Sequence, residues 1–221
     1  MFRAPPLPAP RTMDREDLRQ WIHASMCAWA LAFPWIGKSG AIALGAIAVL
    51  FNALVFPRLP VGRAVARDGE ARWTGVQWYP TAVLGLVLAL PLSLAAGAWG
   101  VLAAGDSASN LVWRRLGRSN PLPWNRSKSL AGAVGFVAAA VPVAWGLIAW
   151  YHARAPEGLW LSDHLLLIAL AGAVVGALVE TLPVKADDNL TVAIAAGAAM
   201  FIAARVWGEV AWVRVGSLLP R

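Results

Sequence analysis

Residues Tyr79–Gly117 read YPTAVLGLVLALPLSLAAGAWGVLAAGDSASNLVWRRLG, an apolar run that ends with one acidic residue, Asp106, and a basic cluster. The run exceeds the about 20 residues that one membrane-spanning helix needs. Pro91 divides it, and proline breaks a helix because it lacks an amide hydrogen and its ring clashes with the preceding turn. We therefore predict two helices, at about 77–90 and about 92–117. One helix kinked at Pro91 is the alternative.

The composition of the whole chain is that of a membrane protein. Of its 221 residues, 59% are hydrophobic and 14% are charged, with a mean hydropathy of +0.59. Soluble domains have about 45–50% apolar and about 25% charged residues. The net charge of +7 comes from bases that cluster between apolar runs. This pattern is typical of membrane loops and argues against a nucleic-acid-binding surface. The single cysteine, Cys27, excludes a disulfide framework.

The other apolar runs complete a helix bundle. Gly37–Gly40 joins the first two runs, which are short, and predicts a tight helical hairpin. We expect an all-α fold, a polytopic membrane bundle of about seven transmembrane helices, or six if Tyr79–Gly117 is one kinked span. Residues 1–17 are Pro-rich and lack a signal-peptide pattern, so we expect a flexible tail before a single membrane domain at 18–221. The remaining runs lie at roughly 22–37, 40–56, 130–150, 163–183 and 190–213.

The distribution of basic residues favours seven spans. Bases gather at 57–78 and at 114–128, and the cytoplasmic loops of membrane proteins carry an excess of Lys and Arg. Both loops lie on one face only if an even number of crossings separates them, which requires the break at Pro91. We therefore expect the N-terminus, both basic loops and residues 184–188 on the cytoplasmic face, as in a bacterial inner membrane.

Two acidic residues at membrane depth have no evident local partner. A charge inside the bilayer costs on the order of 2.5–3.5 kcal/mol, so such residues mark functional sites by default. Asp106 and Glu180 both lie near the cytoplasmic ends of their helices, within reach of the basic loops. Asp106 begins a polar stripe that includes Ser109, Asn110 and Arg114. Hydrogen bonding between helices is the structural alternative for such a stripe.

A second cluster of carboxylates lies in VETLPVKADDNLTV, residues Val179–Val192. Asp187, Asp188 and Asn189 are favoured N-caps for the helix that follows, which is a purely structural interpretation. With Glu180, the two aspartates also suit magnesium, which binds one or two carboxylates together with substrate phosphate oxygens. Arg and Lys would then neutralise the phosphates. The residues alone leave two alternatives: a membrane enzyme that handles phosphates with a metal ion, or a protein that binds anionic lipids.

Several blocks along the chain resemble, in order, those of the dolichol kinase and phytol kinase family. That family includes CTP-dependent diacylglycerol kinases and is related to phosphatidate cytidylyltransferases. Gln20 stands where the family usually has lysine, and Trp113 where it usually has a small glycine. The blocks are LRQWIH (Leu18–His23), RDGEARWTGVQWYP (Arg67–Pro80), GDSASNLVWRRLG (Gly105–Gly117), KSLAG (Lys128–Gly132) and VETLPVKADDNLTV (Val179–Val192).

The resemblance implies a lipid-alcohol kinase that transfers the terminal phosphate of CTP, or of another nucleoside triphosphate. The acceptor would be the hydroxyl of a polyprenol, dolichol, phytol or diacylglycerol. The implied catalytic residues are Asp106, Lys128, Glu180 and Asp188, with Asp106 either holding Mg²⁺ or accepting the hydroxyl proton. The implied magnesium ligands are Asp106, Glu180, Asp187 and Asp188. The implied nucleotide-binding residues are Arg19, His23, Asn110, Arg114, Arg115, Lys128, Ser129, Gly132 and Asn189.

Two other functions stay open: a cytidylyltransferase that forms a CDP-lipid, and a non-catalytic lipid-binding or transport protein. The expected partners are a lipid alcohol, a nucleoside triphosphate and membrane lipids, but no nucleic acid. Gly172 and Gly176 lie four residues apart in one apolar run and permit a close helix contact. That contact could form within the chain or in a homodimer.

Overall fold

The computed structural model describes residues 15–60, 62, 75–116, 120–155 and 164–207, and within these ranges the chain forms helices and no β-strand. The expected all-α fold is confirmed. Of the predicted tail, residues 1–14 lie outside the described ranges. The elements are α1 (Arg15–Met26), the 3₁₀ helix η1 (Cys27–Ala32), α2 (Phe33–Leu54), the 3₁₀ helix η2 (Phe56–Arg58), α4 (Gly75–Ala89), α5 (Leu92–Gly100), the π-helix η3 (Val101–Gly105), α6 (Asp106–Leu116), α7 (Leu130–Arg154), α8 (Leu165–Glu180) and α9 (Asp188–Val206).

The helices have the length and surface of a membrane protein. Three described stretches are long and apolar enough to cross a membrane, and α4 and α8 contain shorter apolar helices. Large apolar side chains face outward on several helices: Ile47 is 63% exposed and Leu130 is 65% exposed. An apolar surface of this extent suits lipid, because soluble proteins rarely expose large apolar patches. The three long stretches are Glu16–Arg58, Leu130–Arg154 and Asp188–Val206.

Pro91 divides the decisive stretch into two helices that run in opposite directions. α4 ends at Ala89 and α5 begins at Leu92, with Pro91 in an extended conformation between them (ψ 143°). Trp99 Nε1 donates a hydrogen bond of 2.7 Å to Tyr79 Oη, although 20 residues separate the two. On one continuous helix they would lie about 30 Å apart. The predicted break at Pro91 is confirmed, and Tyr79–Gly117 is not one kinked span.

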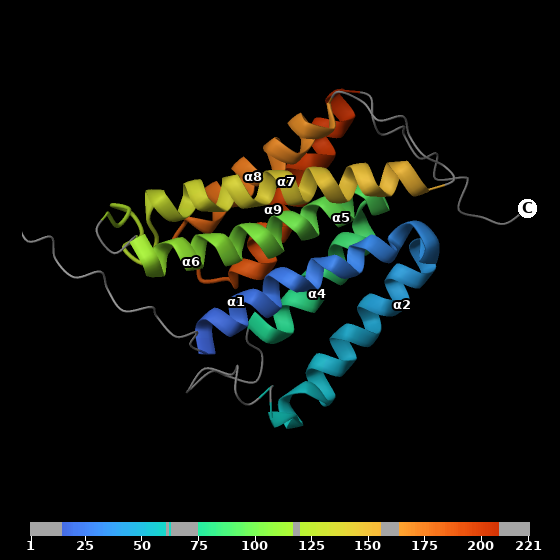
Figure 1. Cartoon of the computed structure of the whole chain (residues 1–221), viewed down its shortest axis with the longest axis horizontal. Helices are drawn as coiled ribbons and strands as arrows, with labels where there is room; N and C mark the ends of the chain where they lie inside the picture. The colour runs from blue at the N-terminus through green and yellow to red at the C-terminus, as the bar shows by residue number, and fades with distance from the viewer. Residues whose placement is uncertain (1–14, 61, 63–74, 117–119, 156–163, 208–221) are drawn as a thin grey trace, which may run out of the picture.

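The predicted hairpin between the first two apolar runs forms at Gly37. Its φ of 61° and ψ of −174° are non-helical and fall in a region that is essentially restricted to glycine. From this turn, α1 and α2 diverge as the two arms of a V (Figure 1). Lys38 follows the turn, and its Nζ donates a hydrogen bond of 2.6 Å to the Leu90 carbonyl. This bond satisfies an acceptor at the end of α4 that has no partner within its own helix.

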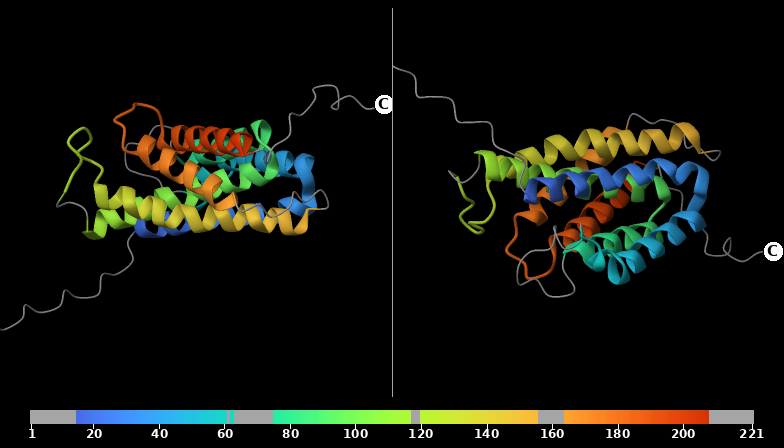
Figure 2. Two further views of the ribbon diagram at one scale, coloured as in Figure 1. Left: turned by 90° about the horizontal axis from the view of Figure 1, so that it is seen from above. Right: turned by 60° about the horizontal axis from the view of Figure 1, so that its bottom comes forward.

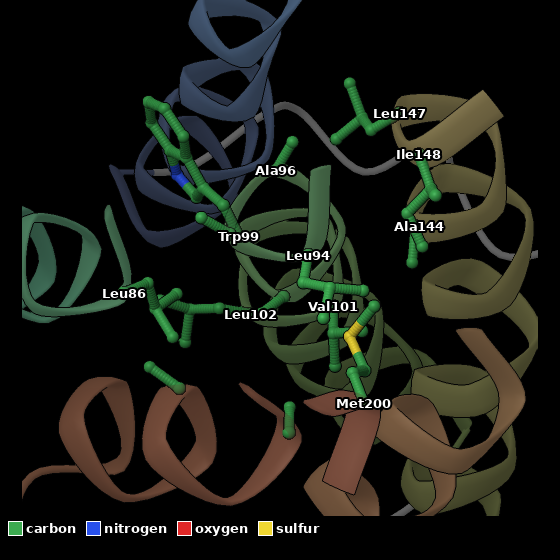
Figure 3. Packing of buried hydrophobic residues seen from close by; sticks show 14 of the residues in the cluster. Leu86, Leu94, Ala96, Trp99, Val101, Leu102, Ala144, Leu147, Ile148 and Met200 are labelled. Carbon is green, nitrogen blue, oxygen red and sulfur yellow. The ribbon is translucent and has the colours of Figure 1, made fainter. Parts of the chain in front are cut away.

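The helix that leads to Asp106 is the centre of the bundle. Every residue of α5 is buried, as are Val101, Leu102, Ala103 and Gly105 of η3. A helix that is apolar all round belongs in a core, and this one packs against α4, α7 and α9. Figure 3 shows Trp99 and Leu102 on one side of this helix, Leu147 and Ile148 of α7 on the opposite side, and Val101 close to Met200 of α9.

The small residues of α8 make contacts within the chain. A Cβ atom on Gly172 would lie 2.4 Å from Met200 Cγ of α9, and one on Gly176 would lie 3.1 Å from Val101. Both glycines therefore permit close packing inside this bundle. In two further views, α8 and α9 lie side by side near α7, while α2 and α4 form the other side of the bundle (Figure 2). The expected homodimer stays a prediction without support from this motif.

Candidate active site

Asp106 lies at the point where the central helix changes from π-helical to α-helical winding. The π-helix η3 ends at Gly105 and α6 begins at Asp106. Short π-helical turns within α-helices frequently occur at functional sites. Asn110, one turn further on, donates a hydrogen bond of 3.2 Å to Asp106 Oδ1. One carboxylate oxygen is thereby fixed, and the other, Oδ2, faces α1.

His23 of α1 is the group that faces Asp106 Oδ2. Its Nε2 lies 3.9 Å from that oxygen, which is too far for a direct hydrogen bond. His23 Nε2 is buried and has no hydrogen-bond partner among the described residues. A hydroxyl oxygen beside the pair can lie about 2.7–2.9 Å from both atoms, within the usual hydrogen-bond range. The gap between His23 and Asp106 therefore has the size and chemistry to hold one hydroxyl group.

Tyr79 of α4 holds His23 in this position. The two rings are 4.1 Å apart between centroids, and Tyr79 Oη donates a hydrogen bond of 3.1 Å to the His23 carbonyl. The same Oη accepts the hydrogen bond from Trp99 Nε1. This chain of contacts links α5, α4 and α1. Neither Tyr79 nor Trp99 was expected at the site from the sequence, because aromatic residues in apolar runs usually pack or anchor.

A second cluster joins the loop before α7 to the facing ends of α8 and α9. Lys128 Nζ donates hydrogen bonds to Glu180 Oε1 over 2.5 Å and to Asp188 Oδ2 over 2.9 Å. Ser109 Oγ of α6 donates a third bond, of 3.0 Å, to the same Glu180 oxygen. The Glu180 side chain is only 1% exposed, whereas that of Asp188 is 39% exposed. Lys128 thus neutralises two predicted site carboxylates.

The electrostatic environment of Lys128 favours its charged form. Burial alone would lower its pKa, but the carboxylates of Glu180 and Asp188 outweigh burial and raise the pKa of Lys128 above its ordinary value. The loop geometry also holds the residue in place, because Leu122 N donates to the Lys128 carbonyl over 2.9 Å and Lys128 N donates to the Asn125 carbonyl over 3.1 Å. Lys128 therefore presents a fixed positive charge.

The start of α9 brings its polar residues to the same region. Asp187 is the N-cap of α9, and its Oδ1 accepts hydrogen bonds of 2.9 Å and 2.8 Å from the backbone and side-chain nitrogens of Asn189. The capping interpretation from the sequence is correct for Asp187. Asp106 is close enough to interact electrostatically with Asp187, Asp188 and Lys128. The two clusters thus form one continuous polar region.

The predicted arginines occupy three different environments. Arg19 Nη1 is buried without a hydrogen-bond partner among the described residues, 3.8 Å from Glu16 Oε2. Arg114 Nη1 donates a hydrogen bond of 2.8 Å to Asp17 Oδ1, which ties α6 to α1. Arg115, the next residue, is exposed. Of the three, Arg19 is the one that lines the same cavity as His23 and Asp106.

Ser129 and Gly132, which were expected at the nucleotide, form the N-terminal cap of α7. Ser129 Oγ accepts a hydrogen bond of 3.0 Å from the Gly132 amide, and Ser129 is only 2% exposed. A Cβ atom on Gly132 would lie 3.1 Å from Ser109 Oγ. In this structure the pair begins α7 and lets α6 approach it closely, which brings Ser109 to Glu180.

A cavity of about 450 Å³ extends from Asp106 between α1, α2 and α4. Its polar end contains Arg19, His23, Asp106 and Asn189, together with Gln20. The remaining lining is mostly apolar. Small-molecule sites typically enclose about 300–1,000 Å³ with mainly apolar walls and a few convergent polar groups. The apolar lining residues include Met26, Phe33, Ala41, Leu44, Ala48, Phe51, Val83, Val87 and Trp99.

The carboxylates suit magnesium only if phosphate oxygens of the substrate complete the metal's coordination shell. Within the described ranges, no three His, Cys, Asp or Glu side chains are grouped as a metal site built from protein alone would require. Magnesium needs only one or two carboxylates when phosphate oxygens complete its shell. Asp106 and the partly exposed Asp188 fit this requirement. Glu180 fits it less well, because its side chain is only 1% exposed and its Oε1 accepts hydrogen bonds from both Lys128 and Ser109, although its Oε2 has no partner among the described residues.

The structure brings several of the predicted site residues together. His23, Asp106 and Asn189 line the cavity, while Lys128, Glu180 and Asp188 are in direct contact next to it. The residues that the sequence did not indicate are Asp17, the partner of Arg114, and the aromatic pair Tyr79 and Trp99. Gln20, the departure from the family lysine, is 3% exposed. Its side chain donates a hydrogen bond to Glu16 Oε1 and its carbonyl accepts one from Ser107.

Comparison with known proteins confirms the predicted resemblance to the phytol kinase family. The chain is 39% identical over 95 residues to probable phytol kinase 3, chloroplastic, of Glycine max, a match that covers 41% of this chain and 28% of that protein. It is 34% identical over 105 residues to farnesol kinase, chloroplastic, of Arabidopsis thaliana, covering 46% and 33%. The matches thus span about a third of the length of these relatives. No family model matches the chain, and no solved structure is significantly similar to it.

Proposed function

We propose that this chain is a membrane-embedded lipid-alcohol kinase of the phytol kinase family. It transfers the terminal phosphate of a nucleoside triphosphate, with CTP the expected donor, to the hydroxyl of an isoprenoid alcohol. The observation that carries the proposal is the cavity, whose apolar walls lead to Asp106 and His23. The names of the relatives, a phytol kinase and a farnesol kinase, support an isoprenoid acceptor.

The reaction requires an alcohol oxygen to attack the terminal phosphorus while the bond from that phosphorus to the diphosphate oxygen breaks. The hydroxyl lies between His23 Nε2 and Asp106 Oδ2, which are 3.9 Å apart. One of these two groups accepts the hydroxyl proton, and the nucleoside diphosphate leaves. Phosphoryl transfer depends mainly on positioning and on neutralising charge, and both requirements are met by the fixed residues around this gap.

The triphosphate binds beside the hydroxyl, between α1, α6 and the start of α9. Arg19 supplies a buried guanidinium, and Lys128 supplies a positive charge held by Glu180 and Asp188. Arg115, which is exposed, contacts the nucleotide from the outer side. When bound, magnesium neutralises phosphate charge, with Asp106 and Asp188 as its protein ligands. This arrangement lies on the cytoplasmic face of the membrane, where the basic loops are expected.

Labelled CTP tests the proposal directly. Purified protein in detergent is incubated with phytol or farnesol, Mg²⁺ and CTP labelled at either the α or the γ phosphate. We expect only the γ label in the lipid product. Transfer of the α label would identify a cytidylyltransferase, and binding of the alcohol without transfer of either label would identify a lipid-binding protein. Replacing CTP with ATP, UTP and GTP in the same assay determines the donor.

A further inference from the structure

Lys128 lies where two connecting segments meet at one end of the bundle. The loop before α7 and the turn between α8 and α9 are found at the same end in both views of Figure 2. Asn125 Nδ2 of the loop donates a hydrogen bond of 3.2 Å to the Thr181 carbonyl of the turn. Between them, Lys128 Nζ donates to Glu180 Oε1 and to Asp188 Oδ2. One ammonium therefore serves two carboxylates that belong to different helices.

The bond from Lys128 to Glu180 is the permanent one of the two. The Glu180 side chain is 1% exposed, and its Oε1 also accepts a hydrogen bond of 3.0 Å from Ser109 Oγ. Its Oε2 is buried without a hydrogen-bond partner among the described residues, so Lys128 is the cation that balances this charge. A buried carboxylate that loses its cation is strongly destabilising. Lys128 therefore stays with Glu180 when another ligand binds nearby.

The bond from Lys128 to Asp188 is the exchangeable one. Asp188 is the first residue of α9, and its side chain is 39% exposed. Water can therefore solvate this carboxylate when it turns away, and ion pairs that are open to solvent contribute little to stability. The backbone of Lys128 keeps its place during such a change, because it is hydrogen-bonded to Leu122 and Asn125. The ammonium thus has one permanent partner and one that another anion can replace.

A phosphate group is the ligand that suits the exchangeable position. Its oxygens accept hydrogen bonds from an ammonium as a carboxylate does. The ammonium has a third donor, but a phosphate bound there would be repelled by the Asp188 charge beside it. The repulsion ends if Asp188 turns to a magnesium ion that the same phosphates bind. Asp106, the other proposed magnesium ligand, is close enough to interact electrostatically with both Lys128 and Asp188.

We propose that Asp188 takes the place of a phosphate at Lys128 until the nucleotide binds, and that it then exchanges Lys128 for magnesium while Glu180 keeps the ammonium in position. The exchange makes the phosphates and the metal bind as one unit. Phosphates without the metal are opposed by the Asp188 carboxylate, and the metal without phosphates competes with Lys128 for that carboxylate. The inference rests on the proposed kinase function, since it concerns the nucleotide half of the same site.

Binding of inorganic tripolyphosphate tests the exchange without a nucleobase or an acceptor alcohol. Purified protein in detergent is titrated calorimetrically with tripolyphosphate, once with EDTA and once with Mg²⁺. For the natural chain we expect tighter binding with Mg²⁺ than with EDTA. In Asp188→Ala, binding with EDTA should become about fivefold tighter, because the competing carboxylate is gone. The ratio of the Mg²⁺ affinity to the EDTA affinity should therefore fall by about fivefold or more.

Asp187→Asn is the matched control for the loss of one negative charge. Asparagine is an equally good N-cap for α9, and Asp187 is hydrogen-bonded to Asn189. This variant should keep the affinity ratio of the natural chain, and the unfolding temperature verifies that both variants are folded. An equal fall of the ratio in Asp187→Asn would reduce the effect to general repulsion and overturn the exchange.

The same titrations separate this inference from the kinase function. An unchanged affinity ratio in Asp188→Ala, or no binding of tripolyphosphate by the natural chain, would overturn the exchange. If the γ label of CTP nevertheless reaches the lipid, the proposed kinase stands without it. If the ratio falls as expected but no nucleoside triphosphate phosphorylates any alcohol, the phosphate exchange at Lys128 stands and the proposed kinase fails.

Discussion

The ammonium of Lys128 and the carboxylate of Glu180, 52 residues apart in the chain, form a hydrogen bond of 2.5 Å, and the Glu180 side chain is only 1% exposed. The bond joins the loop before α7 to the end of α8. Because Asp188 accepts a second bond from the same ammonium, Lys128 connects two acidic residues that would otherwise repel each other. This contact is the structural centre of the nucleotide side of the site.

Removal of Lys128 should destabilise the protein more than removal of the Glu180 charge. Lys128→Met leaves a buried carboxylate without its cation, and breaking a buried pair in this way costs about 3–5 kcal/mol. Glu180→Gln costs less, because Lys128 keeps Asp188. We expect the double variant to lose less than the sum of the single variants. Unfolding in detergent measures all three, and an equal loss in the two single variants would contradict this account.

Asp106→Asn should reduce turnover while the alcohol still binds. A positioned acid or base contributes about 10²–10⁴-fold to a rate, and the asparagine can neither accept the proton nor hold magnesium. We expect kcat to fall within that range, with binding of a radiolabelled isoprenoid alcohol to the protein unchanged. Turnover within about tenfold of the natural chain would remove Asp106 from the mechanism. Binding of the alcohol lost together with turnover would instead show that Asp106 organises the cavity.

Substitution of the adjacent residues Arg114 and Arg115 should have different effects, because we expect a structural role for Arg114 and a nucleotide-binding role for Arg115. Arg114→Gln breaks the partly buried pair with Asp17 and should cost about 1–3 kcal/mol, between the values for exposed and buried pairs. Arg115→Gln should leave the unfolding temperature unchanged and raise KM for the nucleotide, because this exposed side chain is free to reach phosphate. Stability measurements and nucleotide titrations on both variants check the assignment. A loss of stability in Arg115→Gln together with a raised KM in Arg114→Gln would contradict it.

Gly37→Ala should destabilise the hairpin although space is available for the new methyl group. No atom lies within 4 Å of a Cβ built there, but the φ of 61° is strained for alanine, at a cost of about 1–3 kcal/mol. Gly85→Ala in α4 is the control, since its Cβ is equally unobstructed and alanine favours a helix by about 1 kcal/mol. Equal effects of the two substitutions on the unfolding temperature would refute the strained turn.

Local patterns in the sequence were sufficient for the helices and for several of their ends. Pro91 predicted the reversal between α4 and α5, and Gly37–Gly40 predicted the hairpin, because proline and glycine restrict or permit backbone conformations regardless of their surroundings. Asp187 was recognised as a cap for the same reason. The membrane class followed from composition, because the content of apolar and charged residues decides whether a chain is stable in lipid, whatever the order of those residues.

The partners of the charged residues could not be predicted in the same way. Lys128, Arg114 and Arg115 were all expected to bind phosphate, but the sequence did not indicate that Lys128 also bonds to Glu180 and Asp188, or that Arg114 bonds to Asp17. These partners lie 52, 60 and 97 residues away in the chain, and only helix packing brings them together. The sequence did indicate which residues are polar at membrane depth, but not which of them neutralise one another.

The sequence by itself determined that the chain is an all-α membrane bundle with a reversal at Pro91 and polar residues gathered toward one face. The physical reason is that each residue type has its own backbone restrictions and its own free energy of transfer into lipid, and neither depends on distant contacts. Tertiary structure alone decided that His23 Nε2 and Asp106 Oδ2 lie 3.9 Å apart at the end of a cavity. That separation depends on how α1, α4 and the π-helix pack, through Tyr79 and Trp99, and no spacing along the chain encodes it.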